Sequence, residues 1–402
     1  MSTKKILFLT TQLPYPPKSG GTVKSWNYVQ FLAKNYVLSI ACLLKDDDEI
    51  HIDEFQKKIP LNHFSSVKVN SRRSAINLIK SYFISPCLNV YRNKSKKLQK
   101  NIIELASIND ILIIDHYEMF QFIPTNYKGK IVIHTHNAEF MLWQRMSELE
   151  NKNPIKKLLL KLESNRVKKY EKEIFTKADL IYSTPSDIDL YKTHGINVSK
   201  HSLTYHLGND NLLNLKDLEF EQTEKAITFM GTLSWEPNID GLIWFINEVW
   251  PKIITLHPDC KFYILGKTPD ERIIKATNND NRIVFTGFIE NLESYLKKTR
   301  VYIAPLRFGS GMKVKVLEGL YRGVPTVSTS VGIEGLKVYS GKEIMVADDS
   351  EIFAKNCSEL LENKDLWNKL RDNSRKVAAE KYRWEPLFNM MNKKLSDLIL
   401  TS

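Results

Sequence analysis

Short apolar runs alternate with amphipathic segments along most of the chain. In the first half these runs cover 6–9, 37–43, 111–114 and 130–135, and in the second half 226–230, 261–265, 283–285 and 301–306. Segments between them carry apolar residues at helical spacing, as in 23–32, 158–175 and 239–249. Apolar strands that alternate with helices are typical of parallel sheets. The pattern therefore predicts an α/β protein in which one organisation occurs twice.

The apolar periodicity is interrupted near the middle of the chain. After Tyr205 the stretch HLGNDNLLNLKDLEFEQTEK is polar and has no regular period, so it is interpreted as a linker. A length of 402 residues suits two domains that each bury a core. We predict a first domain over 1–205 and a second over 206–384, followed by a terminal helix at 385–402.

The stretch 301–335 carries the clearest local signal. An apolar run leads into Gly309, Ser310 and Gly311, and a helix-period segment follows that Gly323 and Pro325 stop. Strand, glycine turn and helix in this order expose bare backbone N–H groups at a helix start, which favours phosphate.

Three charged residues lie at this predicted helix start. Lys313 and Lys315 can neutralise a phosphate, and the acceptor-only carboxylate of Glu318 suits a pair of sugar hydroxyls. Together they indicate a nucleotide that carries a ribose. The alternative is a common βαβ unit with solvated lysines, and the residues alone leave both interpretations open.

Polar residues also follow several strands of the first half, where parallel sheets bind ligands. Gly20 and Gly21 follow the first strand, Asp115-His116 follows 111–114, and HTHNAEF places His136 at the end of 130–135. A Gly-Gly pair alone is more often a simple turn. His134 alternates with apolar positions, which predicts a hydrogen-bonded core histidine.

The 301–335 stretch resembles the donor-binding signature of glycosyltransferase family 4, retaining enzymes in which an acid, seven positions and a Glu precede an A-x-G-x-P turn. Glu318 matches the second acid, which holds the nucleotide ribose in that family. The first acid, which holds donor-sugar hydroxyls, is replaced here by Ser310. The chain is closer to a subset with the pattern L-R-x-G-S-G-x-x-x-K-x-L-E, which lacks the first acid.

The resemblance implies a fold and a set of roles. The expected fold is GT-B, with two Rossmann-like domains that face a central cleft and a last helix that crosses back to the first domain. His136 is the best match to a family histidine that contacts the donor sugar near its 6-hydroxyl. GTLSWEPN resembles G-R-L-x-x-x-K-G, but Thr232 stands at the Arg position, so Lys315 is expected to supply the charge for a diphosphate.

The expected catalytic residues are thus His136, Lys315 and Glu318. The expected donor-binding residues are Gly20, Gly21, Gly231, Thr232, Arg307, Gly309, Ser310, Gly311, Met312 and Lys313. The irregular stretch 71–100 is expected to hold acceptor-recognising loops.

The implied activity is that of a retaining, nucleotide-sugar-dependent hexosyltransferase acting on a glycan or a lipid-linked acceptor, in bacterial surface polysaccharide or glycoconjugate assembly. Neither a cofactor nor a metal is expected for this activity. The alternatives are a sugar-nucleotide epimerase on the same fold and a non-catalytic scaffold of a polysaccharide assembly complex.

Charge and cysteine usage narrow the classes of partner. The net charge is +12, and basic residues cluster in 72–100 and 156–172. No nucleic-acid motif accompanies them, so nucleic acid is not expected. Such stretches are either the solvated face of a helix or a contact with an anionic membrane.

No apolar run approaches the ~18 residues of a spanning helix, which predicts a cytoplasmic protein or one at the inner face of the cell membrane. The four scattered cysteines predict free thiols.

Overall fold

The chain divides into two compact units. A computed structural model describes residues 4–17, 19–45, 47–69, 75–150, 153–289, 291–309 and 312–400. Unit 1 comprises Met1–His206 with Glu385–Ser402, and unit 2 comprises Leu207–Trp384. The boundary expected from the sequence lies one residue earlier.

Within the described residues, unit 1 contains a seven-stranded parallel sheet in the order β3-β2-β1-β4-β5-β6-β7. Its strands are β1 Lys5–Thr10, β2 Val37–Leu44, β3 His63–Lys68, β4 Ile111–Asp115, β5 Lys130–His134, β6 Leu180–Ser183 and β7 His201–Leu203. The predicted inner strands are confirmed. Both of their faces are buried, which explains their continuous apolar runs. The edge strands β3 and β7 are only partly buried, so they lack the apolar run that marks the others.

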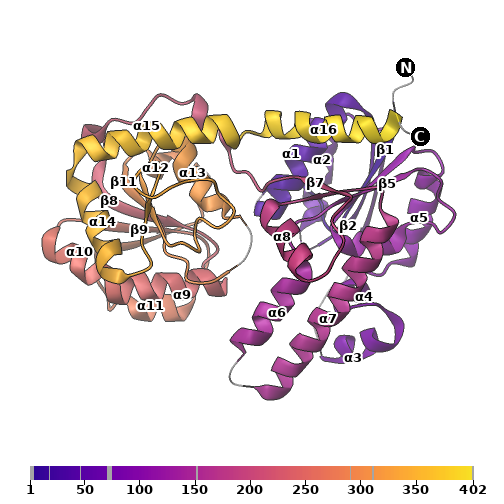
Figure 1. Cartoon of the computed structure of the whole chain (residues 1–402), viewed down its shortest axis with the longest axis horizontal. Helices are drawn as coiled ribbons and strands as arrows, with labels where there is room; N and C mark the ends of the chain where they lie inside the picture. Colours follow the sequence, from indigo (N-terminus) through magenta and orange to yellow (C-terminus); the bar gives the residue numbers. More distant parts are fainter. Residues whose placement is uncertain are drawn as a thin grey trace. The chain divides into compact units, whose positions relative to one another are not determined.

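The helices of unit 1 include one segment that the sequence misjudged. They are α1 Gly20–Asn35, η1 Asp48–His51, α2 Ile52–Lys58, α3 Ala75–Ile84, α4 Leu88–Arg92, α5 Lys96–Ala106, η2 Tyr117–Phe122, α6 Glu139–Leu149, α7 Pro154–Lys177 and α8 Pro185–Thr193 (Figure 1). The prediction of irregular loops over 71–100 is wrong for its described part, which is mostly helical. Helix α8 is capped by Thr184, whose Oγ1 accepts from Asp187 N at 3.2 Å, with Pro185 in the first helical turn.

The last helix, α16 (Trp384–Leu400), packs on unit 1 as predicted. Tyr182 donates its hydroxyl to the Met391 carbonyl at 2.6 Å, and Phe388 stacks on Tyr28 with ring centroids 5.6 Å apart. A buried hydrogen bond and an aromatic stack together fix this helix against the first sheet.

Unit 2 repeats the strand order of unit 1 with six strands in its described residues, β10-β9-β8-β11-β12-β13. These are β8 Glu224–Met230, β9 Lys261–Leu265, β10 Ile283–Gly287, β11 Thr299–Ala304, β12 Thr326–Ser328 and β13 Met345–Val346. The helices are η3 Asp210–Asn214, η4 Phe220–Gln222, α9 Glu236–Trp244, the π-helix η5 Phe245–Val249, α10 Trp250–Leu256, α11 Glu271–Ala276, α12 Glu293–Leu296, α13 Val314–Arg322, α14 Ser350–Glu362 and α15 Lys364–Lys381. Gly323 ends α13 with a φ of 75°, which confirms the predicted stop.

Candidate functional site

Asp115, at the carboxyl end of β4, is the centre of a buried network in unit 1. Its Oδ1 accepts from His134 Nδ1 and His136 Nε2, both at 2.8 Å. Its Oδ2 accepts from Thr10 Oγ1 at 3.0 Å and Ser25 Oγ at 2.6 Å. Burial alone would raise the pKa of this carboxyl, but the nearby histidines and their hydrogen bonds hold it well below its usual range. Asp115 is therefore an ionised carboxylate with both oxygens fully used.

His136 is held in one orientation and one tautomer by this network. Because Nε2 donates to Asp115, Nδ1 carries the lone pair of the neutral ring. Burial lowers the pKa of His136 to about 4, so the ring is neutral at pH 7. Nδ1 is buried without a hydrogen-bond partner among the described residues. A Cβ on Gly21 would lie 3.6 Å from it. The structure thus brings Gly21 and His136 together, with a hydrogen-bond acceptor beside the glycine.

Two further histidines surround His136. The His116 ring stacks on it at a centroid distance of 3.8 Å, and His116 has a φ of 83°, which a side chain rarely adopts. His206 Nε2 donates to the His136 carbonyl at 2.6 Å. The buried Lys24 donates to the neighbouring Thr135 carbonyl at 2.7 Å. Backbone strain such as that at His116 concentrates at functional sites.

Asp115, His134 and His136 also have the composition of a metal site, with ligand atoms within 4.8 Å of one another. The two ring nitrogens that face the carboxylate carry the protons of its hydrogen bonds. A metal would have to displace both protons. The geometry is therefore that of a hydrogen-bonded network, and His134 is the bonded core histidine that the sequence predicts.

In unit 2, the predicted glycine loop connects β11 to α13. Ser310 and Gly311 lie outside the described residues. Gly309 has a φ of 138°, which favours glycine. Met312 and Lys313 are buried, and the Lys313 amine lies 3.6 Å from a Glu334 carboxylate oxygen. The side chain of Lys313, the N-cap residue of α13, makes no capping hydrogen bond.

Lys315 is the second residue of α13. Its amine donates to Asn238 Oδ1 and lies 4.8 Å from the centre of the Phe229 ring. Among the described residues no carboxylate forms an ion pair with it. The side chain keeps some exposure, yet desolvation, aided by Lys313, lowers its pKa to about 7. A Cβ on Gly231 would lie 3.2 Å from the amine, so this glycine gives it room.

Glu318, on the next turn of α13, is half satisfied. Its Oε1 accepts from Asn209 N at 2.9 Å, and Oε2 is buried without a hydrogen-bond partner in the described part of the chain. Burial raises its pKa to about 7. A Cβ on Gly208 would lie 2.3 Å from Oε1, so a larger residue there would displace the Glu318 carboxylate. The stretch predicted as a linker thus supplies the backbone that holds Glu318.

The other predicted donor residues differ in their surroundings. Arg307 forms a bidentate pair with Asp240, with N–O distances of 2.9 and 2.8 Å, so its charge is already compensated. Thr232 is exposed, and its carbonyl accepts from Asn238 Nδ2 at 2.8 Å. Asn238 therefore joins Thr232 to Lys315. In unit 1, Gly20 is the exposed first residue of α1.

The sequence placed Asp115 among the polar residues at the ligand-binding edge but assigned no specific role to it, to Lys24 or to Asn238. The signal for Asp115 was its position at the end of a buried strand. Lys24 is one of many lysines, and only its burial inside α1 marks it.

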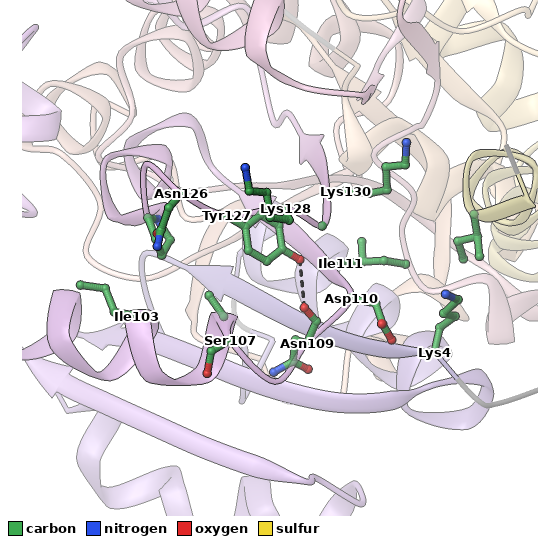
Figure 2. A pocket seen from close by; sticks show the side chains of 14 residues that line it. Lys4, Ile103, Ser107, Asn109, Asp110, Ile111, Asn126, Tyr127, Lys128 and Lys130 are labelled. Atoms are coloured by element: carbon green, nitrogen blue, oxygen red, sulfur yellow. Dashed lines mark hydrogen bonds between the residues drawn. The ribbon is translucent and has the colours of Figure 1, made fainter. Parts of the chain in front are cut away.

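A surface cavity of about 530 Å³ lies elsewhere in unit 1 (Figure 2). Its lining includes Lys4, Asp110 and Lys130, at the amino ends of β1, β4 and β5, and Tyr127 donates to the Asn109 carbonyl there at 3.1 Å. Parallel sheets bind ligands at the opposite, carboxyl edge. This cavity is separate from the Asp115 network.

Comparison with known proteins finds a family match within unit 2. Residues 224–363 match the family model "Glycosyl transferases group 1". An "uncharacterized 44.6 kDa protein in cps region" of Klebsiella pneumoniae is 23% identical over 397 residues, 97% of this chain and 99% of that protein.

Solved structures share the fold at low identity. Anabaena HepE in complex with UDP and glucose is 12% identical, with a TM-score of 0.67 over 98% of this chain and 100% of that one. A point mutant of S. aureus TarM, in complex with Fondaparinux, α-GlcNAc-glycerol and UDP, is 14% identical, with a TM-score of 0.68 over 97% and 99%. The predicted GT-B architecture of two Rossmann-like units is confirmed.

Among the helices of the described ranges, none combines the length and the apolar character that crossing a membrane requires.

Proposed function

We propose that this chain is a glycosyltransferase that moves a sugar from a nucleotide-sugar to a glycan or lipid-linked acceptor, with retention of configuration. The observation that carries the proposal is the pair of unbalanced side chains on α13. The Lys315 amine has no carboxylate partner among the described residues, and the Glu318 carboxyl group has one oxygen without a hydrogen-bond partner there. The match to group 1 glycosyl transferases over 224–363 covers both.

The donor nucleotide is assigned to this region of unit 2. A diphosphate meets the start of α13, which the Lys313 side chain does not cap, and the Lys315 amine, so helix dipole and charge act on the same anion. Arg307 does not supply this charge, because Asp240 neutralises it. The free Oε2 of Glu318 accepts a hydrogen bond from a ribose hydroxyl.

The chemical step breaks the bond between the anomeric carbon and the phosphate oxygen and forms a bond from that carbon to the acceptor oxygen. The acceptor proton passes to the departing phosphate oxygen on the same face, so no protein carboxylate pair is needed. Charge accumulates on the leaving diphosphate. Lys315 and the α13 amides stabilise that charge in the transition state.

His136 is assigned to the transferred sugar. Its Nδ1 is an acceptor because Asp115 holds the proton of the neutral ring on Nε2, and it suits a sugar hydroxyl beside Gly21. Asp115 is then a positioning residue, because it acts through the ring and not on the substrate. The cps-region relative supports surface polysaccharide assembly as the setting.

Nucleotide binding tests this function. We expect the full chain to bind one of UDP, GDP or ADP in isothermal calorimetry and to hydrolyse or transfer from the corresponding nucleotide-sugar. Lys315→Met should weaken that binding, and Lys369→Met, at an exposed site on α15, should leave it unchanged. If no nucleotide binds and no sugar is released, the scaffold alternative replaces this proposal.

A further inference from the structure

Helix α3 turns its apolar side away from the protein. Ile76, Ile79 and Phe83, at positions i, i+3 and i+7, are 65%, 61% and 84% exposed. Ser81 is fully buried on the other side, and Leu78 packs against the core of unit 1. A surface helix normally does the opposite and buries its apolar stripe.

The first turns of α7 have the same inverted pattern. Ile155, Leu158 and Leu162 repeat the i, i+3, i+7 spacing and are 72%, 56% and 42% exposed. Lys156, Lys157 and Lys161 flank this stripe. Two helices of one unit therefore expose apolar stripes.

Arg166 of α7 holds the two helices together. Its guanidinium donates to Ser81 Oγ at 3.0 Å and to the carbonyls of Ser81 and Ser85 at 2.7 and 3.0 Å. It also lies 3.9 Å from the centre of the Tyr82 ring. Figure 1 shows α3 beside α7, with α6 along its other side. The stripes thus belong to one region, named here the α3–α7 face: Ile76, Ile79, Phe83, Ile155, Leu158 and Leu162.

The charge around this face is one-sided. Residues 75–100 contain six Lys or Arg and no acid, and residues 153–172 contain seven Lys or Arg and two Glu. Those two, Glu163 and Glu171, are each 1% exposed, so the exposed charge of both stretches is positive. Lys156 is paired with an acid outside these stretches, because its amine lies 2.5 Å from a Glu150 carboxylate oxygen.

We propose that the α3–α7 face docks on an anionic lipid bilayer. Apolar stripes flanked by lysines enter the interface between headgroups and acyl chains, while the lysines meet anionic headgroups. Charge complementarity selects this occupant. A second copy of the chain would place two equally basic faces against each other, which repel. The inference goes beyond the proposed transferase activity and does not depend on it.

Vesicle co-sedimentation of the full chain, without substrate, tests the proposal. We expect binding to vesicles of phosphatidylglycerol and phosphatidylcholine, little binding to phosphatidylcholine alone, and release by salt. Phe83→Gln with Ile79→Gln, and separately Leu158→Gln with Leu162→Gln, should each lower the partition coefficient by at least about tenfold. These side chains are exposed, so the thermal midpoint should not fall.

A matched control replaces exposed apolar residues of unit 2, Leu256→Gln with Ile352→Gln, and should bind vesicles like the parent chain. Equal binding to neutral and anionic vesicles would overturn the proposal, as would parental binding by both α3 and α7 variants. Dimerisation that the same variants abolish, without vesicle binding, would assign the face to a second copy instead.

Discussion

The two units share a strand order but treat buried charge in opposite ways. In unit 1, the Asp115 carboxylate accepts four hydrogen bonds, two on each oxygen. In unit 2, Glu318 accepts one, and Lys315 has an amide and an aromatic ring in place of a counter-ion. A saturated carboxylate organises its neighbours, whereas an unsatisfied one is available to a ligand. The comparison separates a positioning network from a binding site on the same type of sheet.

The largest expected effect comes from removing the carboxylate of Asp115. Asp115→Ala removes the acceptor of two rings and two hydroxyls and leaves them buried, so we expect the free energy of unfolding to fall by about 3 kcal/mol or more. Urea denaturation measures it. The control Asp348→Ala removes a carboxylate that accepts at the exposed Ser330 N and should cost far less. A loss below about 1 kcal/mol would contradict the central role of Asp115.

The second prediction concerns how the Glu318 carboxyl group makes the stability of the fold depend on pH. The pKa of Glu318 is raised to about 7 from 4.5, so the folded chain binds more protons than the unfolded chain between these pH values. Stability is then lost as the pH rises through that window, by up to about 3 kcal/mol. Glu318→Gln should remove this loss and make the variant more stable than the parent at pH 8, while nucleotide binding weakens. A variant less stable at pH 8 would show that Glu318 is structural.

The third prediction concerns transition-state charge. Lys315→Met should lower turnover at least about tenfold, on the order of 1.4 kcal/mol, because one contact to the leaving diphosphate is lost. Arg307→Gln serves as the control, since its charge is already neutralised by Asp240. Steady-state rates with a nucleotide-sugar measure both. If the Lys315 variant turns over at the parental rate, another residue must supply the positive charge that stabilises the diphosphate.

The smallest expected effect sharpens the role of His136. Gly21→Ala places a methyl group 3.6 Å from Nδ1, an ordinary contact distance that folding tolerates but that crowds a hydroxyl donor. We expect turnover to fall several-fold with the thermal midpoint unchanged or higher, since Ala favours helix over Gly. Unchanged turnover would indicate that no substrate group approaches this nitrogen.

The sequence predicted the elements whose formation depends on residues close together along the chain. β4 is buried at every position, so its apolar run is unmistakable. The start and stop of α13 follow from glycines within the same stretch. Glu318 was found through its spacing in a motif.

Contacts between distant residues were not accessible in the same way. Glu318 meets Asn209 across 109 positions, inside a stretch whose composition suggests only a linker. Helix α3 is held by Arg166, 85 positions beyond Ser81, so nothing in its own sequence reveals the partner that orders it. Similarly, the four donors to Asp115 come from β1, α1 and the end of β5, and only the folded sheet brings them together.

A lysine that titrates near neutrality makes anion capture a proton-coupled event. With a pKa of about 7, Lys315 is partly deprotonated at pH 7 in the ligand-free chain, so an anion that pairs with its ammonium form must also recruit a proton. Arrival of a diphosphate restores the full positive charge by drawing roughly half a proton from the buffer. The heat of nucleotide binding should therefore vary with the ionisation enthalpy of the buffer chosen.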